Sequence, residues 1–293
     1  MSGITDDKDV DPQSGVKGYI ISTDPTTPTE DSSWTLSTAE IVTYEGALEL
    51  TTYYFWVIDN VGNISEVTEL TTKEIFYSIN HTSWYETFAD AVADAEESGD
   101  TIYVLKDVLD ESNGTVDKNV KLDLNGHTLS RGKTGETNIY ENSIVINQNA
   151  SLEVIGTGTL QSASIGYPTF VSEGDLKITS GNITSAYSII SVRGAGNAEV
   201  VGGTLTATSG NSAIGNFGSG TVTINGGTIS NNSAWTTIAN QGTGSIIIND
   251  GIITNSEETL HRAIVNTATG NVTVSGGDIT GHIYSGSGTV QLN

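Results

Sequence analysis

The chain has 293 residues and 36% of them are apolar, which is enough for two folded domains with buried cores. The 35 acidic residues outnumber the 11 basic ones and give a formal net charge of −24, so neither nucleic acid nor an anionic membrane is expected as a partner. No apolar run reaches the roughly 18 residues that a membrane-spanning helix needs, and cysteine is absent, so we expect no membrane insertion and favour an extracellular bacterial surface.

Residues 1–75 contain short alternating strands at about 17–22, 33–36 and 51–58, separated by turn residues, which is typical of a β-sandwich. The segments Ser14-Gly-Val-Lys-Gly-Tyr19, Trp34, Tyr53-Tyr-Phe-Trp-Val and Asp59-Asn-Val-Gly-Asn63 carry a more specific likeness. They resemble the Ig-like or fibronectin-III-like repeats of bacterial cell-surface proteins. The resemblance implies an Ig-like module at 1–75 that acts as a spacer or in adhesion, with a first strand that is barely present.

Three carboxylates alternate near the amino terminus, at Asp7, Asp9 and Asp11. Calcium prefers such oxygen ligands. However, Pro12 stands where an EF-type loop needs glycine, and Gly18 stands where that loop needs its bidentate glutamate. Two interpretations stay open, a calcium site between the domains or an acidic terminus without a metal, and no other cofactor is expected.

Residues 76–110 are predicted to hold a short amphipathic helix followed by a strand at 101–105. Ser83 and Glu86 have the spacing of a capping box at the start of this helix. The apolar residues that follow share one helical face, and they are Trp84, Phe88, Ala91, Val92 and Ala95. Because an open end of a repeat fold exposes apolar core and unpaired strand edges, we expect the helix to cap the region that follows. A partner-binding helix is the alternative.

From Val120 onward the sequence repeats with a period near 24 residues. Segments of alternating apolar and polar residues start 24, 22, 24, 24 and 26 residues apart, at Leu152, Leu176, Ala198, Val222, Ile246 and Val272. A second apolar pulse comes eight residues before most of these segments, at Ile144, Ile190, Ile214, Ile238 and Ile264. Alternation indicates strands, and glycine pairs such as Gly226-Gly227 indicate corners. The period therefore predicts an all-β solenoid, a parallel β-helix of seven or eight turns that rises about 4.8 Å per turn.

A helix, the strand Ile102-Tyr-Val-Leu105 and the first coil at 120–129 follow one another in this order. The order resembles the start of right-handed parallel β-helix proteins of the pectate-lyase-like superfamily, over residues from about 77 to 293. The resemblance implies that 76–293 form a right-handed parallel β-helix with an N-terminal helical cap. The superfamily includes lyases, hydrolases, esterases, tailspikes and non-catalytic adhesins, so the activity stays open.

The catalytic motifs of enzymes in that superfamily are not intact here. The Asn-Thr-Asp motif of polygalacturonase-like members corresponds to Asn266-Thr-Ala268, and their Gly-His-Gly motif fails at Thr128 and at Ile283. Pectate lyases gather carboxylates around calcium, whereas the closest such pair on a predicted corner here is Glu173 and Asp175. Glycoside hydrolysis needs two carboxyl groups on either side of the scissile bond. We therefore assign no catalytic residue.

Residues at matching places in successive coils are expected to stack one strand spacing apart. The outward column of the first strand alternates in charge over its first four members, and it reads Lys121, Glu153, Lys177, Glu199, Thr223, Ile247 and Thr273. This column predicts exposed ion pairs, with a catalytic Lys177 as the alternative. A second column, of Asn216, Asn240 and Asn266, predicts a ladder of amides inside the scaffold.

A third column stands three residues before each second apolar pulse, and it reads Tyr167, Tyr187, Asn211, Trp235 and His261. Tyrosine and tryptophan rings offer an apolar face with a polar edge, on which sugar rings can pack. We predict that Tyr167, Tyr187, Trp235 and His261 line a carbohydrate-binding strip. The alternative is a corner ladder that serves stability alone.

The segment 131–142 stretches the first interval between coils to 32 residues. Long loops on a rigid scaffold often carry recognition, so Arg131 and Lys133 are candidates to contact an acidic sugar. An ordinary surface insertion is the alternative.

These features favour a non-catalytic, adhesin-like protein of a bacterial cell surface. We expect its β-helix to present a surface to a carbohydrate or a host glycan, and we expect a monomer. Two other functions stay open, namely a polysaccharide lyase or glycoside hydrolase and a passive stalk within a longer surface protein.

Overall fold

The computed structural model describes residues 15–37, 44, 47–96, 99–111, 114–131, 143–209, 211–256 and 262–293. The chain divides into two compact units, Met1–Ile75 and Phe76–Asn293. Strands account for 51% of the structure, so the fold is all-β as predicted. None of the described helical structure has the length and hydrophobicity that crossing a bilayer requires.

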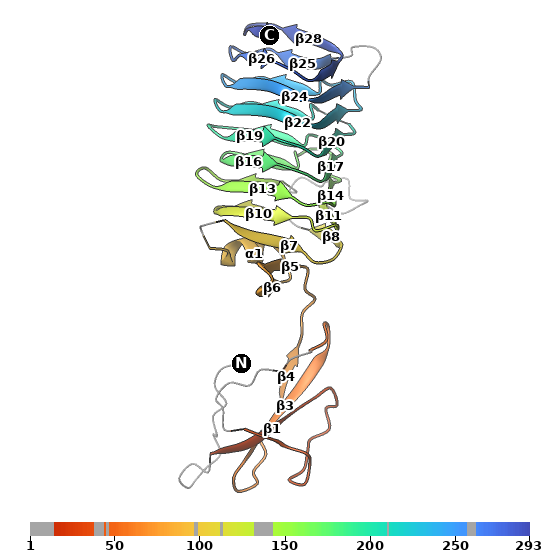
Figure 1. The fold of residues 1–293 in the computed structure, drawn as a ribbon. Coiled ribbons are helices and arrows are strands. Elements are labelled where there is room, and N and C mark those ends of the chain that lie inside the picture. The colour runs from red at the N-terminus through yellow and green to blue at the C-terminus, as the bar shows by residue number, and fades with distance from the viewer. Residues whose placement is uncertain are drawn as a thin grey trace. The chain divides into compact units, whose positions relative to one another are not determined.

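The first unit has an antiparallel sheet of four strands in the order β2-β1-β3-β4 (Figure 1). The strands are β1 (Val16–Ser22), β2 (Thr35–Leu36), β3 (Thr52–Asp59) and β4 (Thr68–Thr71). The first three lie at predicted places, whereas β4 has no counterpart among the predicted strands. The buried tryptophan of this sheet is Trp56 rather than Trp34, which is half-buried. After β3, the carboxylate of Asp59 accepts the N–H groups of Val61 and Asn63 at 2.9 and 2.7 Å, which closes the predicted turn.

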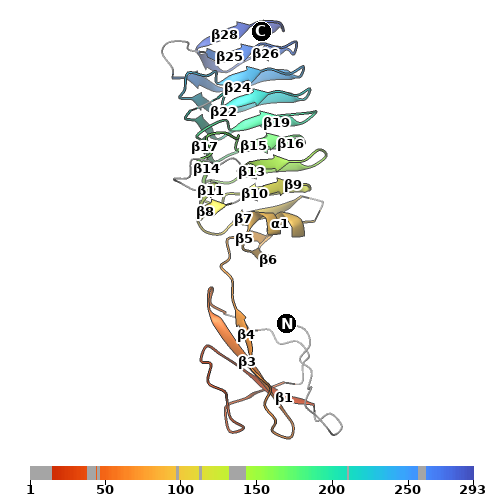
Figure 2. The same cartoon turned by 180° about the vertical axis from the view of Figure 1, so that it is seen from behind.

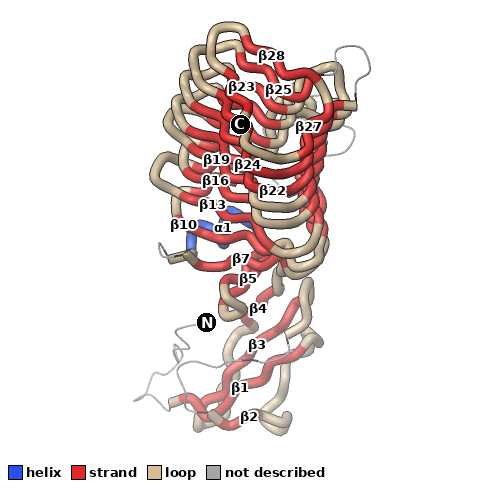
Figure 3. The backbone as a smooth tube through the Cα atoms, turned by 45° about the horizontal axis from the view of Figure 1, so that its top comes forward, coloured by secondary structure: helices blue, strands red, loops and turns tan. Residues whose placement is uncertain are grey.

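The second unit is a parallel β-solenoid of about seven turns, as the period of the sequence predicts (Figure 1 and Figure 3). Each turn has a first, a second and a third strand. First and second strands belong to one sheet of 17 strands, and third strands form a separate sheet of eight (Figure 2).

The first strands are β7 (Asp100–Val104), β10 (Asn119–Asp123), β13 (Ser151–Ile155), β16 (Asp175–Ile178), β19 (Asn197–Val200), β26 (Val272–Val274) and β29 (Val290–Leu292). The second strands are β8 (Val108–Glu111), β11 (Thr128–Arg131), β14 (Thr159–Ser162), β17 (Asn182–Ser185), β20 (Thr204–Ala207) and β27 (Asp278–Thr280). In two turns one long strand includes both, and these are β22 (Thr221–Asn231) and β24 (Ser245–Asn255). The third strands are β9 (Gly114–Val116), β12 (Ile144–Ile146), β15 (Phe170–Ser172), β18 (Ile190–Val192), β21 (Ile214–Asn216), β23 (Ile238–Asn240), β25 (Arg262–Asn266) and β28 (His282–Ser285).

The core of the solenoid is a stack of aliphatic side chains held in register. In the third-strand sheet the leading residues pair from turn to turn, in the order Ile144, Phe170, Ile190, Ile214, Ile238 and Ile264. All six are fully buried. Burial of apolar area contributes about 25 cal/mol per Å², so each turn is stabilised mainly by the turns on either side of it.

One short helix, α1 (Phe88–Asp94), precedes the first strand of the first turn. Its N-cap is Thr87, whose Oγ1 accepts the N–H of Asp90 at 3.1 Å. Phe88 and Val92 are buried where the helix packs on β5 (Tyr77–Ile79), β6 (Ser83–Tyr85) and β9. At the other end, Lys118 Nζ donates to the carbonyls of Ala93 and Ala95 at 2.5 and 2.6 Å, which places a positive charge at the negative end of the helix dipole.

The predicted start of this helix at Ser83 is wrong. Ser83 and Trp84 belong to β6, which pairs antiparallel with β5, so their backbone groups are committed to a sheet. Trp84 is 59% exposed and does not share the buried face of the helix. The other predicted members of that face, Phe88, Ala91, Val92 and Ala95, are buried.

Candidate functional site

The corners between second and third strands carry large aromatic side chains at one stacked position. Tyr167, Tyr187 and Trp235 each stand three residues before a third strand, and Asn211 holds this place in the turn between the last two. The third strands that follow are paired in register, so these four residues hold equivalent places in successive turns. We call Tyr167, Tyr187, Asn211 and Trp235 the corner column.

The rings of the corner column are open to solvent to different degrees. Trp235 is 57% exposed, Tyr167 is 40% exposed, and Tyr187 is half-buried. Asn211 Nδ2 donates to the hydroxyl of Tyr187 at 2.9 Å and so links two neighbouring turns. Exposed rings of this size provide contact area for a partner at little cost in conformational entropy.

Buried polar side chains fix the backbone beneath these rings. Ser185 Oγ accepts the N–H of Tyr187 at 3.2 Å. At the next aromatic corner, Asn231 Nδ2 and Asn255 Nδ2 both donate to the carbonyl of Trp235, at 3.3 and 2.5 Å. The backbone of the corner is therefore anchored to the interior by side chains that stand at the ends of the second strands.

Sequence reasoning missed Asn231 and Asn255. Both are almost fully buried and pair in register, Asn231 with Asn255 on the next turn. Their signal was present, because they are 24 residues apart and occupy the same strand-end place as Ser162 and Ser185 in earlier turns. A polar residue repeated at an inward position indicates a side chain that binds the backbone of a corner.

The first-strand column has the predicted register. Lys121, Glu153, Lys177 and Glu199 are paired in sequence along β10, β13, β16 and β19. Lys121 Nζ lies 3.2 Å from a carboxylate oxygen of Glu153, and Lys177 Nζ lies 3.5 Å from one of Glu199. The charges on this face therefore pair with each other.

The carboxylate of Glu153 has several polar neighbours in this column. Partial burial raises its pKa, but hydrogen bonds from Lys121 and Thr179 and the charges of Lys121 and Lys177 outweigh burial, so the net pKa is lowered. The Thr179 hydroxyl donates to the carboxylate at 3.0 Å. A lowered pKa suits an ion pair and is the opposite of what a general acid needs.

The asparagine column lies inside the solenoid, as predicted. Asn216, Asn240 and Asn266 are fully buried and paired from turn to turn. Each Nδ2 donates to a glycine carbonyl four residues later, at 3.0, 3.0 and 2.8 Å respectively. Asn240 Nδ2 also lies 3.2 Å from Asn266 Oδ1, so the ladder runs between turns. This column is enclosed in the solenoid and stabilises the scaffold.

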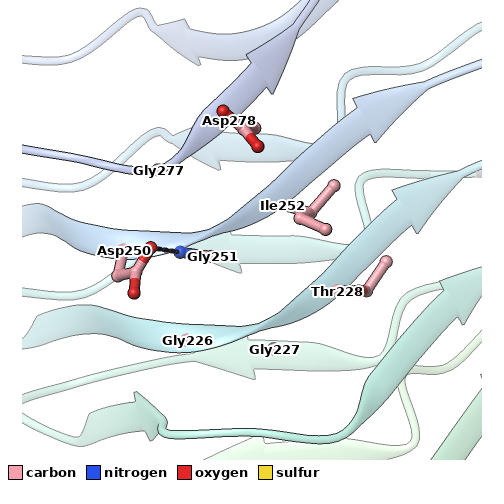
Figure 4. Close-up of a pocket in the computed structure, with 8 residues that line it drawn as sticks. All are labelled: Gly226, Gly227, Thr228, Asp250, Gly251, Ile252, Gly277 and Asp278. Atoms are coloured by element: carbon pink, nitrogen blue, oxygen red, sulfur yellow. Dashed lines mark hydrogen bonds between the residues drawn. The ribbon is translucent and has the colours of Figure 1, made fainter.

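A depression of about 440 Å³ lies over the glycine corners of three turns (Figure 4). Its lining consists of Gly226, Gly227, Thr228, Asp250, Gly251, Ile252, Gly277 and Asp278. Gly227 has φ of +82°, and a Cβ there would lie 2.9 Å from the carbonyl oxygen of Gly203, so only glycine fits. The depression is thus a consequence of corners that lack side chains, with one carboxylate in each of two turns.

Arg131 ends β11 and is fully buried, so its side chain does not reach a surface ligand. A Cβ on Gly114 would lie 3.9 Å from the Arg131 guanidinium, which places that group at the first third strand. Five other predicted site residues lie outside the described part of the chain. They are the calcium candidates Asp7, Asp9 and Asp11, the strip residue His261 and the loop residue Lys133. Among the residues that the structure describes, no three acidic or histidine side chains gather closely enough to hold a metal ion.

Comparison with known proteins gives no match to a family model, a curated protein or a solved structure. The parallel β-solenoid therefore rests on the structure of this chain alone.

Proposed function

We propose that the protein is a non-catalytic, adhesin-like protein of a bacterial cell surface whose β-helix binds carbohydrate through the corner column. One observation carries the proposal. Two exposed rings, Tyr167 and Trp235, and the half-buried Tyr187 stand on stacked corners whose backbone is anchored by buried serine and asparagine side chains. Sugar rings have apolar C–H faces that pack on such aromatic surfaces, and a rigid scaffold lowers the entropic cost of binding.

The other parts of the chain have supporting roles in this proposal. The first unit is an Ig-like or fibronectin-III-like spacer, and the second is a right-handed β-helix similar to the pectate-lyase-like superfamily. Right-handed crossovers are the rule between parallel strands of one sheet. Helix α1 acts as the cap of the solenoid. Phe88 supports this role, because it is fully buried and its ring packs so closely on β9 that a Cβ on Gly114 would lie 2.8 Å from it. The surface location rests on the acidic composition and on the absence of cysteine.

A polysaccharide lyase or hydrolase finds less support among the described residues. Lys177, the alternative catalytic base, is ion-paired with Glu199. Glu153 has a lowered pKa, whereas the acid of a glycoside hydrolase needs a raised one. Both groups are occupied by their neighbours in the first-strand column.

Glycan-array binding tests the proposal, with the wild type compared with Trp235→Ala and Tyr187→Ala. Loss of a stacking ring is expected to weaken binding by about tenfold or more. Trp84→Ala is the matched control, because Trp84 is 59% exposed and Trp235 is 57% exposed, yet Trp84 lies in β6 away from the corner column. Binding that is unchanged in Trp235→Ala, or that falls equally in Trp84→Ala, contradicts the proposal.

A further inference from the structure

The outer face of four second strands, next to the corner column, is lined by hydroxyl and amide side chains. We call this surface the polar wall, and it consists of the first and third residues of β14, β17, β20 and of 228–231 in β22. In each of these segments the second and fourth residues are buried, so the first and third face outward. Neighbouring segments are paired residue by residue, which produces two straight columns with one polar group per turn.

Several hydroxyls of the polar wall have hydrogen-bonding capacity to spare. Within the described residues, the side chains of Thr184, Thr204 and Thr228 make no hydrogen bond to another protein group. Ser230 Oγ donates to Thr206 Oγ1 at 3.1 Å. Among the described residues, this is the one side-chain hydrogen bond that joins two residues of the polar wall. A threonine hydroxyl can donate once and accept twice, so the wall offers unused donors and acceptors.

The polar wall is also uncharged, although the chain carries a net charge of −24. The neighbouring first-strand column differs, because its lysines and glutamates face each other in pairs. An acidic polymer, such as a uronic-acid or sulfated glycan, would be repelled by the protein as a whole and would find no lysine or arginine on the wall. A neutral polymer rich in hydroxyl groups would be matched in charge and in hydrogen bonding.

The wall and the corner column occupy the same four turns. The corners that follow β14, β17, β20 and β22 carry Tyr167, Tyr187, Asn211 and Trp235 respectively. Polar groups that repeat once per turn, beside corners that carry aromatic side chains, suit a linear polymer that lies along the solenoid axis.

We propose that the ligand of this surface is a neutral, linear polysaccharide that lies along the solenoid axis. Its sugar rings pack on Tyr167, Tyr187 and Trp235, and its hydroxyl groups hydrogen-bond with Thr184, Thr204 and Thr228. This inference rests on the proposed function and adds to it the class of glycan and a second row of contacts.

Titration of the full chain against purified oligosaccharides of increasing length tests the inference. The neutral probes are cello-, xylo- and manno-oligosaccharides, and the acidic ones are oligogalacturonate and alginate fragments. We expect neutral probes to bind, with affinity that rises with length until four turns are covered, and acidic probes not to bind. Tighter binding of an acidic probe than of every neutral one would overturn the inference.

The double variant Thr204→Val/Thr228→Val removes two hydroxyls with little change of shape. It is expected to bind the preferred neutral probe about tenfold more weakly or worse, since two hydrogen bonds to the sugar are lost. Thr223→Val is the matched control, because Thr223 lies in β22 like Thr228 but belongs to the first-strand column. An unfolding curve of each variant, compared with that of the wild type, checks that the variant is folded.

The two proposals fail in distinguishable ways. Binding that is lost in Trp235→Ala but unchanged in the double valine variant overturns the inference and leaves the proposed function standing. Binding that neither variant weakens, or the absence of binding to any probe, overturns both.

Discussion

Two polar columns run along the solenoid in register, one inside and one outside. Asn216, Asn240 and Asn266 are fully buried and bind glycine carbonyls and one another. On the outer face, Lys121 and Glu153 form an ion pair whose side chains are 46% and 26% exposed. Both columns arise from the same rule, which is that equivalent residues of successive turns lie about 4.8 Å apart.

The difference between the columns is burial, and burial sets how much each contributes to stability. When a buried asparagine amide is removed, the glycine carbonyl that it bonded is left without a partner and out of reach of water. This lowers the free energy of unfolding by roughly 1–3 kcal/mol. An exposed ion pair is solvated on both sides and contributes about 0.2–1 kcal/mol. The polar wall is a third case, because solvent can reach its hydroxyls, and we propose that they contribute to binding rather than to stability.

The largest effect is expected from Asn240→Ala. This change removes the donor to the Gly244 carbonyl, at 3.0 Å, and empties a buried site, so the free energy of unfolding should fall by about 2 kcal/mol. Denaturant unfolding measures it. Asn249→Ala is the control, since Asn249 is an exposed residue of β24 whose Nδ2 donates to Asn225 Oδ1 on the surface at 2.8 Å. Equal effects of the two changes would contradict the inside–outside comparison.

A charge reversal in the outer column should have a smaller effect. Glu153→Lys places like charges in register between Lys121 and Lys177, and it should lower the free energy of unfolding by about 1 kcal/mol at low salt and less at high salt. Thr223→Lys introduces the same side chain next to Glu199 and should leave stability unchanged or slightly raised. Destabilisation by both changes to the same extent would show that register does not matter.

The pH dependence of the same site should be weaker still. The folded pKa of Glu153 is lowered below its usual 4.5, so the carboxylate contributes stability above the unfolded pKa and loses it as the pH falls through the folded pKa. At neutral pH, Glu153→Gln should lower the free energy of unfolding by less than about 1 kcal/mol. Unfolding curves of wild type and variant should converge as the pH falls through the lowered, folded pKa of Glu153. A gap that persists at low pH would assign the effect to packing.

The smallest effect on stability is expected from Thr228→Val. The hydroxyl of Thr228 bonds to no protein group in the described part of the chain, so the free energy of unfolding should stay within about 0.5 kcal/mol of wild type. Thermal unfolding measures this, alongside glycan binding, which should weaken. Destabilisation as large as that of Asn240→Ala would mean that the polar wall serves the scaffold.

The register of these columns could be predicted from the sequence because the apolar period fixes which residues share a turn. Lys121, Glu153, Lys177 and Glu199 follow from counting along the repeats, and the strand pairing confirms them. The third strands could be predicted from the second apolar pulse in each repeat. Asn231 and Asn255 also repeat at one strand-end place, but this repeat was not recognised as an inward-facing position.

The start of α1 could not be predicted from local signals alone. Ser83 and Glu86 have the spacing of a capping box, but pairing of β6 with β5 takes up the backbone that such a cap would need. Thr87 and Asp90 have the same spacing, and they form the cap that the structure has. The two local patterns have the same spacing, and the pairing of β6 with β5 determines that the helix starts at the second one.

The placement of Arg131 also depended on packing rather than on pattern. The residue stands at the boundary between a strand and a long insertion, and the sequence alone assigns it to the insertion. In the structure it is the last residue of β11 and fully buried. Burial of an arginine is uncommon, although Arg131 pairs with Ser162 and so holds the inward strand-end place of the second strands.

A crystal structure of the chain with the tightest-binding neutral oligosaccharide is the most direct test of the account. We predict sugar rings against Tyr187 and Trp235 and sugar hydroxyls within hydrogen-bond distance of Thr204 and Thr228, with the oligosaccharide parallel to the solenoid axis. An oligosaccharide found instead on the first-strand column, or in the depression beside Asp250 and Asp278, would contradict it.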